Sequence, residues 1–219
     1  MLPPRTEEEL VERARHLTGR TLGEIAARLN VPLPESQARA KGLVGQLMEK
    51  ALGASAGSRS EPDFLEIGVE LKTLPVGADG KPKESTFVAS LPLMTLTEVD
   101  YEDSFVAKKL VRVLWVPIQA DPAIPLRDRR VGRALLWSPT EEERAVLRAD
   151  YERIAHLVLD GAHADVNGRL GTYLQVRPKA ADSQVRGKTM DDLGQIAWTG
   201  PRGFYLRPQF TLRVLRSMT

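Results

Sequence analysis

Residues 110–118 read Leu-Val-Arg-Val-Leu-Trp-Val-Pro-Ile, a near-continuous apolar run. Such a run, rich in branched and aromatic side chains, predicts a strand that is covered on both faces. An alternating pattern over Val69–Thr73 predicts a second strand, and Thr86–Leu91, beyond the Asp79-Gly80 turn, predicts a third. The chain is therefore expected to fold around a central sheet that lies between helices.

Helical segments flank these strands. Thr6 with Glu9 and Thr21 with Glu24 have the spacing of capping boxes, and each precedes an apolar stripe. The remaining expected elements are a helix over Pro34–Leu52 that ends at Gly53, a helix from Ser138 to Leu159, strands over Tyr173–Arg177 and Phe204–Arg207, a short helix near Asp191 and an amphipathic helix at the C-terminus. The fold class is α/β or α+β, and 219 residues without a long linker fit one domain, residues 1–219.

Composition excludes several classes of protein. The chain has no cysteine, so disulfide scaffolds, thiolate zinc sites and cysteine nucleophiles are excluded, and a reducing compartment is expected. No apolar run approaches the ~20 residues that a membrane span needs, and no signal peptide is recognisable. Nucleotide-binding glycine loops and a serine–histidine triad motif are also missing.

Charge is unevenly distributed along the chain. The net charge is only +2, but residues 61–103 carry 10 acidic and 3 basic side chains. Residues 104–133 carry 7 basic and 2 acidic side chains, and residues 163–219 carry 9 basic and 4 acidic ones. The distribution fits a protein that holds metal ions beside a polyanion, although differently charged solvated faces would give the same pattern.

Within the acidic segment, Asp63, Glu70 and Lys72 form a candidate catalytic group. Residues two apart on a strand share a face, so Glu70 and Lys72 are expected side by side, while Val69 and Leu71 point into the core. Gly68 permits a turn that brings the Asp63 carboxylate to Glu70. Two carboxylates make a hard-oxygen site for Mg²⁺, and a lysine beside them suits phosphodiester hydrolysis. The alternative is an ordinary solvated strand face.

Two helical features bear on the same question. Lys41, Gly45 and Glu49 recur every four residues and would line one helix face that could look onto this site. The segment Thr21–Leu33 also resembles the first half of a helix-turn-helix, with Pro34–Leu52 as recognition helix, which would make the protein a non-catalytic DNA-binding regulator. The start of that helix is acidic and polar, which is a poor entry to a phosphate backbone.

Several longer blocks carry a more specific signal. They are Leu52-Gly-Ala-Ser-Ala-Gly-Ser58, Asp63-Phe64, Gly68-Val-Glu-Leu-Lys-Thr73, Arg112-Val-Leu-Trp115, Leu135-Leu-Trp-Ser-Pro139, Tyr173-Leu-Gln-Val-Arg-Pro-Lys-Ala180 and Pro201-Arg-Gly-Phe-Tyr-Leu206. In this order, and over nearly the whole chain, they resemble the MutH family of DNA mismatch-repair endonucleases. The resemblance implies a restriction-endonuclease-like fold with a central mixed sheet flanked by helices, and two lobes around a DNA cleft. The stretch Asp182–Gly200 matches poorly.

The resemblance also implies an activity and its partners. The family nicks the unmethylated strand 5′ to the G of hemimethylated GATC in double-stranded DNA, leaves a 5′-phosphate, and is activated by MutL after MutS has found a mismatch. A monomer in the bacterial cytoplasm, working at the nucleoid, is expected, with Mg²⁺ as cofactor and Mn²⁺ as a substitute.

The residues that the resemblance assigns fall into three groups. The expected metal ligands are Asp63 and Glu70; the further catalytic residues are Lys72, Glu49 and Lys109; the residues that read GATC and its methylation are Lys41, Arg177, Pro178 and Tyr205. Arginine can bond to N7 and O6 of guanine, which suits Arg177. A stand-alone restriction endonuclease of the same fold is the alternative within this fold class.

Overall fold

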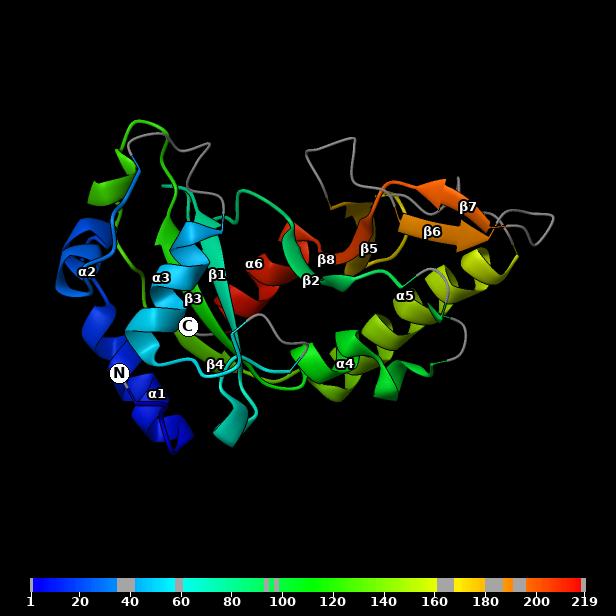
Figure 1. Cartoon of the computed structure of the whole chain (residues 1–219), viewed down its shortest axis with the longest axis horizontal. Coiled ribbons are helices and arrows are strands. Elements are labelled where there is room, and N and C mark those ends of the chain that lie inside the picture. Colours follow the sequence, from blue (N-terminus) through cyan, green and yellow to red (C-terminus); the bar gives the residue numbers. More distant parts are fainter. Residues whose placement is uncertain are drawn as a thin grey trace. The chain divides into compact units, whose positions relative to one another are not determined.

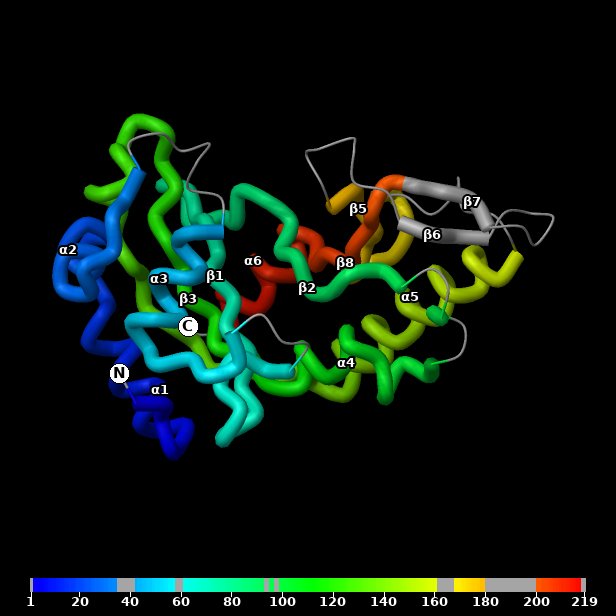
Figure 2. Tube along the Cα trace, in the orientation of Figure 1, coloured from blue at the N-terminus to red at the C-terminus, as the bar shows by residue number. Residues whose placement is uncertain are grey.

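A computed structural model gives the fold of the chain (Figure 1). The structure describes residues 2–34, 42–57, 61–92, 95–96, 99–160, 168–179, 187–190 and 196–217, the backbone alone for 187–190 and 196–199. The chain divides into two compact units. One contains residues 1–84, 111–138 and 212–219, and the other contains residues 85–110 and 139–211. The path in Figure 2 therefore passes from the first unit to the second and back twice.

Three helices begin the first unit: α1 (Glu7–Leu17), α2 (Leu22–Arg28) and α3 (Leu43–Leu52). Thr21 and Glu24 form the expected capping box of α2. At α1 only half of the expected box is present, because the Thr6 hydroxyl accepts from the Glu9 N–H while the Glu9 carboxylate accepts from the Arg5 N–H. The expected helix over Pro34–Leu52 is described only from Leu43, after Gly42, and ends at Gly53 as predicted. Residues 35–41 lie outside the described part of the chain.

The sheet of the first unit contains β1 (Glu70–Val76), β3 (Val113–Gln119) and β4 (Leu135–Trp137), in the order β1-β3-β4. Strands β1 and β3 are parallel, and β3 and β4 are antiparallel, so the sheet is mixed. The apolar run does form a strand, β3, whose residues 113–116 are buried on both faces as predicted. The strand starts at Val113, three residues after the start of the run, and Leu110, the first residue of the run, is instead the last residue of helix α4 (Phe105–Leu110).

One face of this sheet carries the core of the unit. Leu71 on β1 and Leu114, Val116 and Ile118 on β3 belong to one buried cluster with the apolar sides of the three helices. Helix α3 packs against β1, as the cyan helix beside the sheet in Figure 1 illustrates. The opposite face carries Glu70 and Lys72, because side chains alternate along a strand.

The second unit has its own sheet, β2 (Thr86–Ser90), β8 (Arg202–Leu206) and β5 (Leu174–Pro178), in the order β2-β8-β5 and antiparallel throughout. Helix α5 (Glu141–Leu159) packs on it, and the rings of Tyr151 and Phe204 stack with centroids 5.5 Å apart. A capping box of Thr140 and Glu143 starts α5, which confirms the helix expected from this segment.

The C-terminal part differs from the expectation at one point. Strands β6 (Gly187–Met190) and β7 (Ile196–Thr199) form an antiparallel pair where only a short helix near Asp191 was expected; Asp191 itself lies outside the described residues. Helix α6 (Pro208–Arg216) is the expected amphipathic C-terminal helix. The mixed α+β fold class is confirmed.

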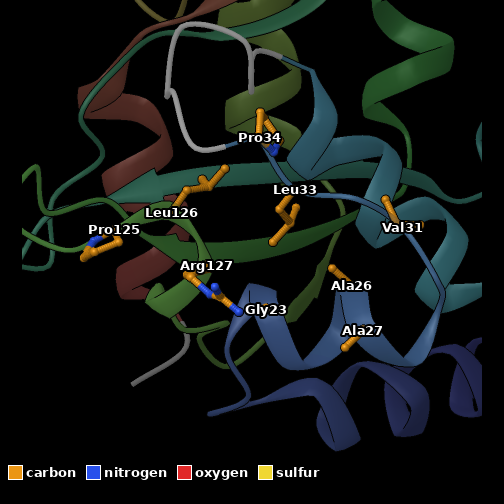
Figure 3. A pocket seen from close by; sticks show the side chains of 9 residues that line it. All are labelled: Gly23, Ala26, Ala27, Val31, Leu33, Pro34, Pro125, Leu126 and Arg127. Atoms are coloured by element: carbon orange, nitrogen blue, oxygen red, sulfur yellow. The ribbon is translucent and has the colours of Figure 1, made fainter.

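Two further observations concern the surface. In the described part of the chain, no helix is both long enough and apolar enough to cross a membrane. A hollow beside α2 has a volume of about 450 Å³ and is lined by apolar residues, among them Leu33, Pro34 and Leu126, with Arg127 at its border (Figure 3). No carboxylate or histidine lines it, so it has none of the groups that the predicted chemistry requires.

Candidate active site

The Asp63 carboxylate is fixed against the outer edge of β1. Its Oδ2 atom accepts a hydrogen bond of 2.8 Å from the backbone N–H of Leu71. The neighbouring N–H, that of Glu70, donates to the carbonyl of Arg112 beside β3. Since alternate N–H groups of a strand point to opposite sides, Asp63 satisfies a donor that faces away from β3, on the edge of the sheet.

A short turn brings Asp63 to this edge. The backbones of Phe64 and Val69 pair with each other across the 3-10 turn Leu65–Ile67, and Gly68 closes the turn with φ of +65°. A side chain at that φ would be strained, so glycine suits the position. The turn that the sequence predicts at Gly68 is present, and it brings the Asp63 carboxylate to the backbone of β1 at Leu71; that the two carboxylates meet stays a prediction.

Glu70 and Lys72 form a buried ion pair. Lys72 Nζ donates to Glu70 Oε1 over 2.7 Å, and Glu70 is only 2% exposed. Val69 and Leu71 are buried in the core on the other side, as the alternating pattern predicts. The alternative interpretation, a solvated strand face, is wrong for Glu70, because a carboxylate removed from water needs a partner and Lys72 supplies one.

Aromatic side chains lie on the same face of the sheet as this pair. Lys72 is in register with Trp115 on β3, and Trp115 packs edge-on against Trp137 of β4, with ring centroids 6.1 Å apart. Trp115 is fully buried. An apolar neighbourhood weakens solvent screening, so the attraction between Glu70 and Lys72 is stronger than that of an exposed pair.

Backbone hydrogen bonds hold residues 53–56 to Glu49 on one side and to Asp63 on the other. The carbonyl of Glu49, near the end of α3, accepts from the N–H groups of Gly53 and Ala54, and the carbonyl of Asp63 accepts from those of Ser55 and Ala56. Residues 53–56 thus form a tight loop between α3 and Asp63. The Glu49 side chain is half-buried on a helix that packs against β1.

The second unit presents a different set of side chains. Gln175 and Arg177 on β5 share a face, and Gln175 is in register with Tyr205 on β8, which is in turn in register with Phe87 on β2. The rings of Phe87 and Tyr205 meet edge-on with centroids 5.3 Å apart, and Lys179 Nζ lies 5.1 Å from the Phe87 ring centroid. We call these five residues the sheet face of the second unit.

Arg177, Lys179 and Pro178 are exposed, whereas Tyr205 and Phe87 are half-buried. An exposed arginine and lysine beside two aromatic rings are suited to a polyanion that also carries flat bases. Pro178, the last residue of β5, is in register with Arg202.

Comparison with known proteins identifies the family. Residues 52–150 match the family model described as "DNA mismatch repair enzyme MutH". The DNA mismatch repair protein MutH of Shewanella amazonensis is 46% identical over 215 residues, 98% of this chain and 96% of the relative. The MutH protein of Yersinia enterocolitica is 48% identical over 95% of this chain and 92% of its own length. That of Yersinia pseudotuberculosis is 48% identical over 97% of this chain and 93% of its own length.

The chain belongs to the MutH family of DNA mismatch-repair enzymes. The predicted family is confirmed, and with it the expectation of a mismatch-repair nuclease. The two alternatives that the sequence left open, a stand-alone restriction enzyme and a non-catalytic regulator, are not supported by these relatives.

The structure brings some of the candidate residues of this MutH-family chain together and leaves others apart or outside the described residues. It pairs Glu70 with Lys72 on β1 and bonds the Asp63 carboxylate to the Leu71 N–H of the same strand, and it places Arg177 and Pro178 on β5 and Tyr205 on the neighbouring strand β8. Lys109 lies half-buried in the last turn of α4, in the second unit. Lys41 lies outside the described residues.

The chemistry of the donor set limits how a metal would be held. Within the described residues, no three or more histidine or acidic side chains are grouped so that they could hold an ion. Mg²⁺ commonly binds through one or two carboxylates and completes its shell with water and substrate phosphate. Asp63 and Glu70 fit this mode of binding rather than that of a closed structural metal site.

Sequence reasoning missed a structural carboxylate, Asp150 on α5. It is 6% exposed and accepts three backbone hydrogen bonds, from Thr172 and Tyr173 at 2.7 Å and from Leu174 at 2.9 Å. The signal was present, because Asp150 interrupts the apolar stripe Leu147, Tyr151, Ile154 and Val158 that faces the sheet. Asp150 thereby fixes the start of β5, the strand that carries Arg177.

Proposed function

We propose that the chain is a Mg²⁺-dependent endonuclease that nicks the unmethylated strand of hemimethylated GATC sites in double-stranded DNA. The observation that carries the proposal is the buried Glu70–Lys72 pair beside the edge-bound Asp63 carboxylate. The family assignment supports the same chemistry.

Asp63 and Glu70 are the proposed metal ligands. Asp63 Oδ2 accepts a hydrogen bond from the Leu71 N–H, and Glu70 Oε1 accepts one from Lys72 Nζ. These bonds orient the carboxylates before substrate arrives, which lowers the reorganisation required on binding. Mg²⁺ held there would activate water and offset charge on the scissile phosphate, and Mn²⁺ would substitute for it.

Lys72 is the proposed group that faces the reacting phosphate. Its ammonium has three donors, of which one binds Glu70, so others remain to stabilise the charge that develops on the phosphate or to orient the attacking water. Water adds to phosphorus, the bond between phosphorus and the 3′ oxygen breaks, and that oxygen takes up a proton. The products are a 5′-phosphate and a 3′-hydroxyl. We assign Glu49 and Lys109 supporting roles in this reaction.

The sheet face of the second unit, together with Pro178 at the end of β5, is the proposed reading surface. Arg177 would donate to N7 and O6 of guanine, while Tyr205 on this face and Pro178 at the strand end would contact the adenine N6 group in the major groove. A methyl group there removes a donor and adds bulk, so a closely fitted wall rejects methylated adenine. Lys41 is assigned to the same recognition by resemblance.

The proposed context is methyl-directed mismatch repair. The chain would act as a monomer, be activated by MutL after MutS has bound a mismatch, and work on chromosomal DNA in the bacterial cytoplasm. Activation by a partner is consistent with a nuclease that must not cut every newly replicated site.

The test uses supercoiled plasmids whose GATC sites are unmethylated, hemimethylated or fully methylated, incubated with Mg²⁺ and MutL. We expect nicking of the first two and none of the third, with strand-resolved gels locating each nick 5′ to G. Glu70→Gln and Lys72→Ala should each reduce nicking at least about 100-fold. Glu66→Gln changes an exposed glutamate of the nearby turn and is the matched control.

Each contrary outcome is informative. Equal nicking of all three plasmids would contradict methylation sensing, and full activity of Glu70→Gln would contradict the metal site. Double-strand cleavage without MutL would identify a stand-alone restriction enzyme. Binding without any nicking would identify a regulator.

A further inference from the structure

The hydroxyl of Ser85 links two polar side chains of β5. Ser85 Oγ accepts 2.7 Å from Gln175 Nε2 and 3.0 Å from Arg177 Nη1. Ser85 directly precedes β2, whereas Gln175 and Arg177 are two apart on β5, at the other edge of the same sheet. No sequence motif relates these residues, since Ser85 and Arg177 are 92 positions apart.

Arg177 has donors left over in this arrangement. A guanidinium has five N–H groups. Among the described residues, Ser85 is the only hydrogen-bond partner of the Arg177 guanidinium. Arg177 is also exposed. Its remaining donors are therefore available to a ligand while one contact fixes the direction of the guanidinium.

A serine hydroxyl suits the orientation of the Arg177 guanidinium better than a carboxylate does. An aspartate would form an ion pair with Arg177, neutralise its charge and compete with an incoming base. A neutral hydroxyl orients the group and leaves the charge for DNA. Both hydroxyl lone pairs are occupied, by Gln175 and Arg177, so the oxygen itself is held in place.

We propose that Ser85 is a positioning residue for base reading: it holds Arg177 in the orientation that meets guanine. This inference rests on the proposed function of Arg177. An arginine side chain loses rotamer entropy when it is fixed. Ordering part of the side chain in the free protein lowers the cost of binding, and it does so only for DNA that offers the matching acceptors.

The experiment measures binding of short duplexes in Ca²⁺, which keeps the DNA uncut. One duplex has a normal GATC site, a second has 7-deazaguanine in that site, which removes the N7 acceptor, and a third has no GATC. The discrimination ratio is the affinity for the first divided by the affinity for the second. For the wild-type chain we expect a ratio of about 10, the effect of losing one good guanine contact.

Ser85→Ala should reduce this ratio about threefold or more and leave affinity for the duplex without GATC unchanged. Ser85→Thr keeps the hydroxyl and should restore the ratio. Ser90→Ala is the comparison, because Ser90 Oγ accepts a hydrogen bond of 2.7 Å from Nζ of Lys179, which directly follows β5. That variant should leave the ratio unchanged, since an ammonium does not match guanine bidentately.

A double variant separates positioning from general damage. In an Arg177→Lys background, Ser85→Ala should have no additional effect on the ratio. An unchanged ratio in Ser85→Ala, or an equal fall in Ser85→Thr with unaltered thermal unfolding, would overturn the role of Ser85. A wild-type ratio of one would instead overturn the proposed guanine contact of Arg177, and the inference with it.

Discussion

The Asp63 carboxylate and the Leu71 backbone N–H are joined by a 2.8 Å hydrogen bond across the turn that precedes β1. The bond places a carboxylate on the edge of the strand at Leu71, which lies between Glu70 and Lys72, the two residues of the buried ion pair. The same bond satisfies a backbone donor of the strand. Asp63 therefore has a structural role that can be separated from its charge.

Replacing Asp63 by asparagine tests this separation. The asparagine carbonyl can still accept from the Leu71 N–H, so thermal unfolding should shift by less than about 3 °C. The negative charge is lost, so Mg²⁺-dependent nicking should fall on the order of 10²–10³-fold. Asp63→Ala should lose activity and also about 1–2 kcal/mol of stability, because the donor loses its partner. Nicking by Asp63→Asn at the wild-type rate would contradict the assignment.

Asp150 should matter for stability more than any exposed acid on the same helix. Asp150→Ala leaves three backbone N–H groups without their acceptor, and we expect a loss of about 3 kcal/mol in the free energy of urea unfolding. Asp150→Asn retains one carbonyl oxygen and should lose less. Glu152→Ala removes an exposed acid two residues away and should change stability by less than about 0.5 kcal/mol. Comparable losses in Asp150→Ala and Glu152→Ala would refute the role of Asp150.

Gly203 leaves space for the Phe87 ring. A Cβ atom at Gly203 would lie 2.8 Å from Phe87 Cε2 and 3.0 Å from the carbonyl oxygen of Ala89. Gly203→Ala should therefore displace the ring from its edge-on contact with Tyr205 and weaken binding to GATC duplexes about 10-fold. Gly200→Ala is the control, because nothing lies within 4 Å of a Cβ atom there. Equal affinities of the two variants in a fluorescence anisotropy titration would count against this arrangement.

Tyr101 should make the fold sensitive to alkaline pH. Burial raises the pKa of Tyr101 to about 12, and its ring packs edge-on against Tyr151. An unfolded tyrosine ionises near pH 10, so the unfolded chain loses this proton first as pH rises. The contribution to stability is thus intact below pH 10 and is lost between about pH 10 and 12.

Urea unfolding at pH 9 and pH 11.5 would measure this effect, with Tyr101→Phe as the reference. Between pH 9 and pH 11.5, the free energy of unfolding of the wild-type chain should fall by about 1–2 kcal/mol more than that of Tyr101→Phe. Parallel losses in both proteins would mean that other groups cause the alkaline instability.

Local patterns predicted most of the elements around the site. Capping residues located the starts of α2 and α5, and the period of two placed Glu70 and Lys72 on one face with Leu71 on the other. The three-residue strand β4 and the β6–β7 pair were missed. Short strands have little periodicity of their own and are defined by the strand they pair with.

The sequence by itself determined the α+β class, the family and the neighbouring Glu70 and Lys72, because these depend on residues close together in the chain. Tertiary structure decided that Glu70 is buried, that Asp150 fixes the start of β5, and that Ser85 holds Arg177. Each of these contacts joins residues that only the pairing of strands and the packing of helices bring together. A hydrogen bond between distant residues leaves no period in the sequence, since either partner alone looks like any other polar residue.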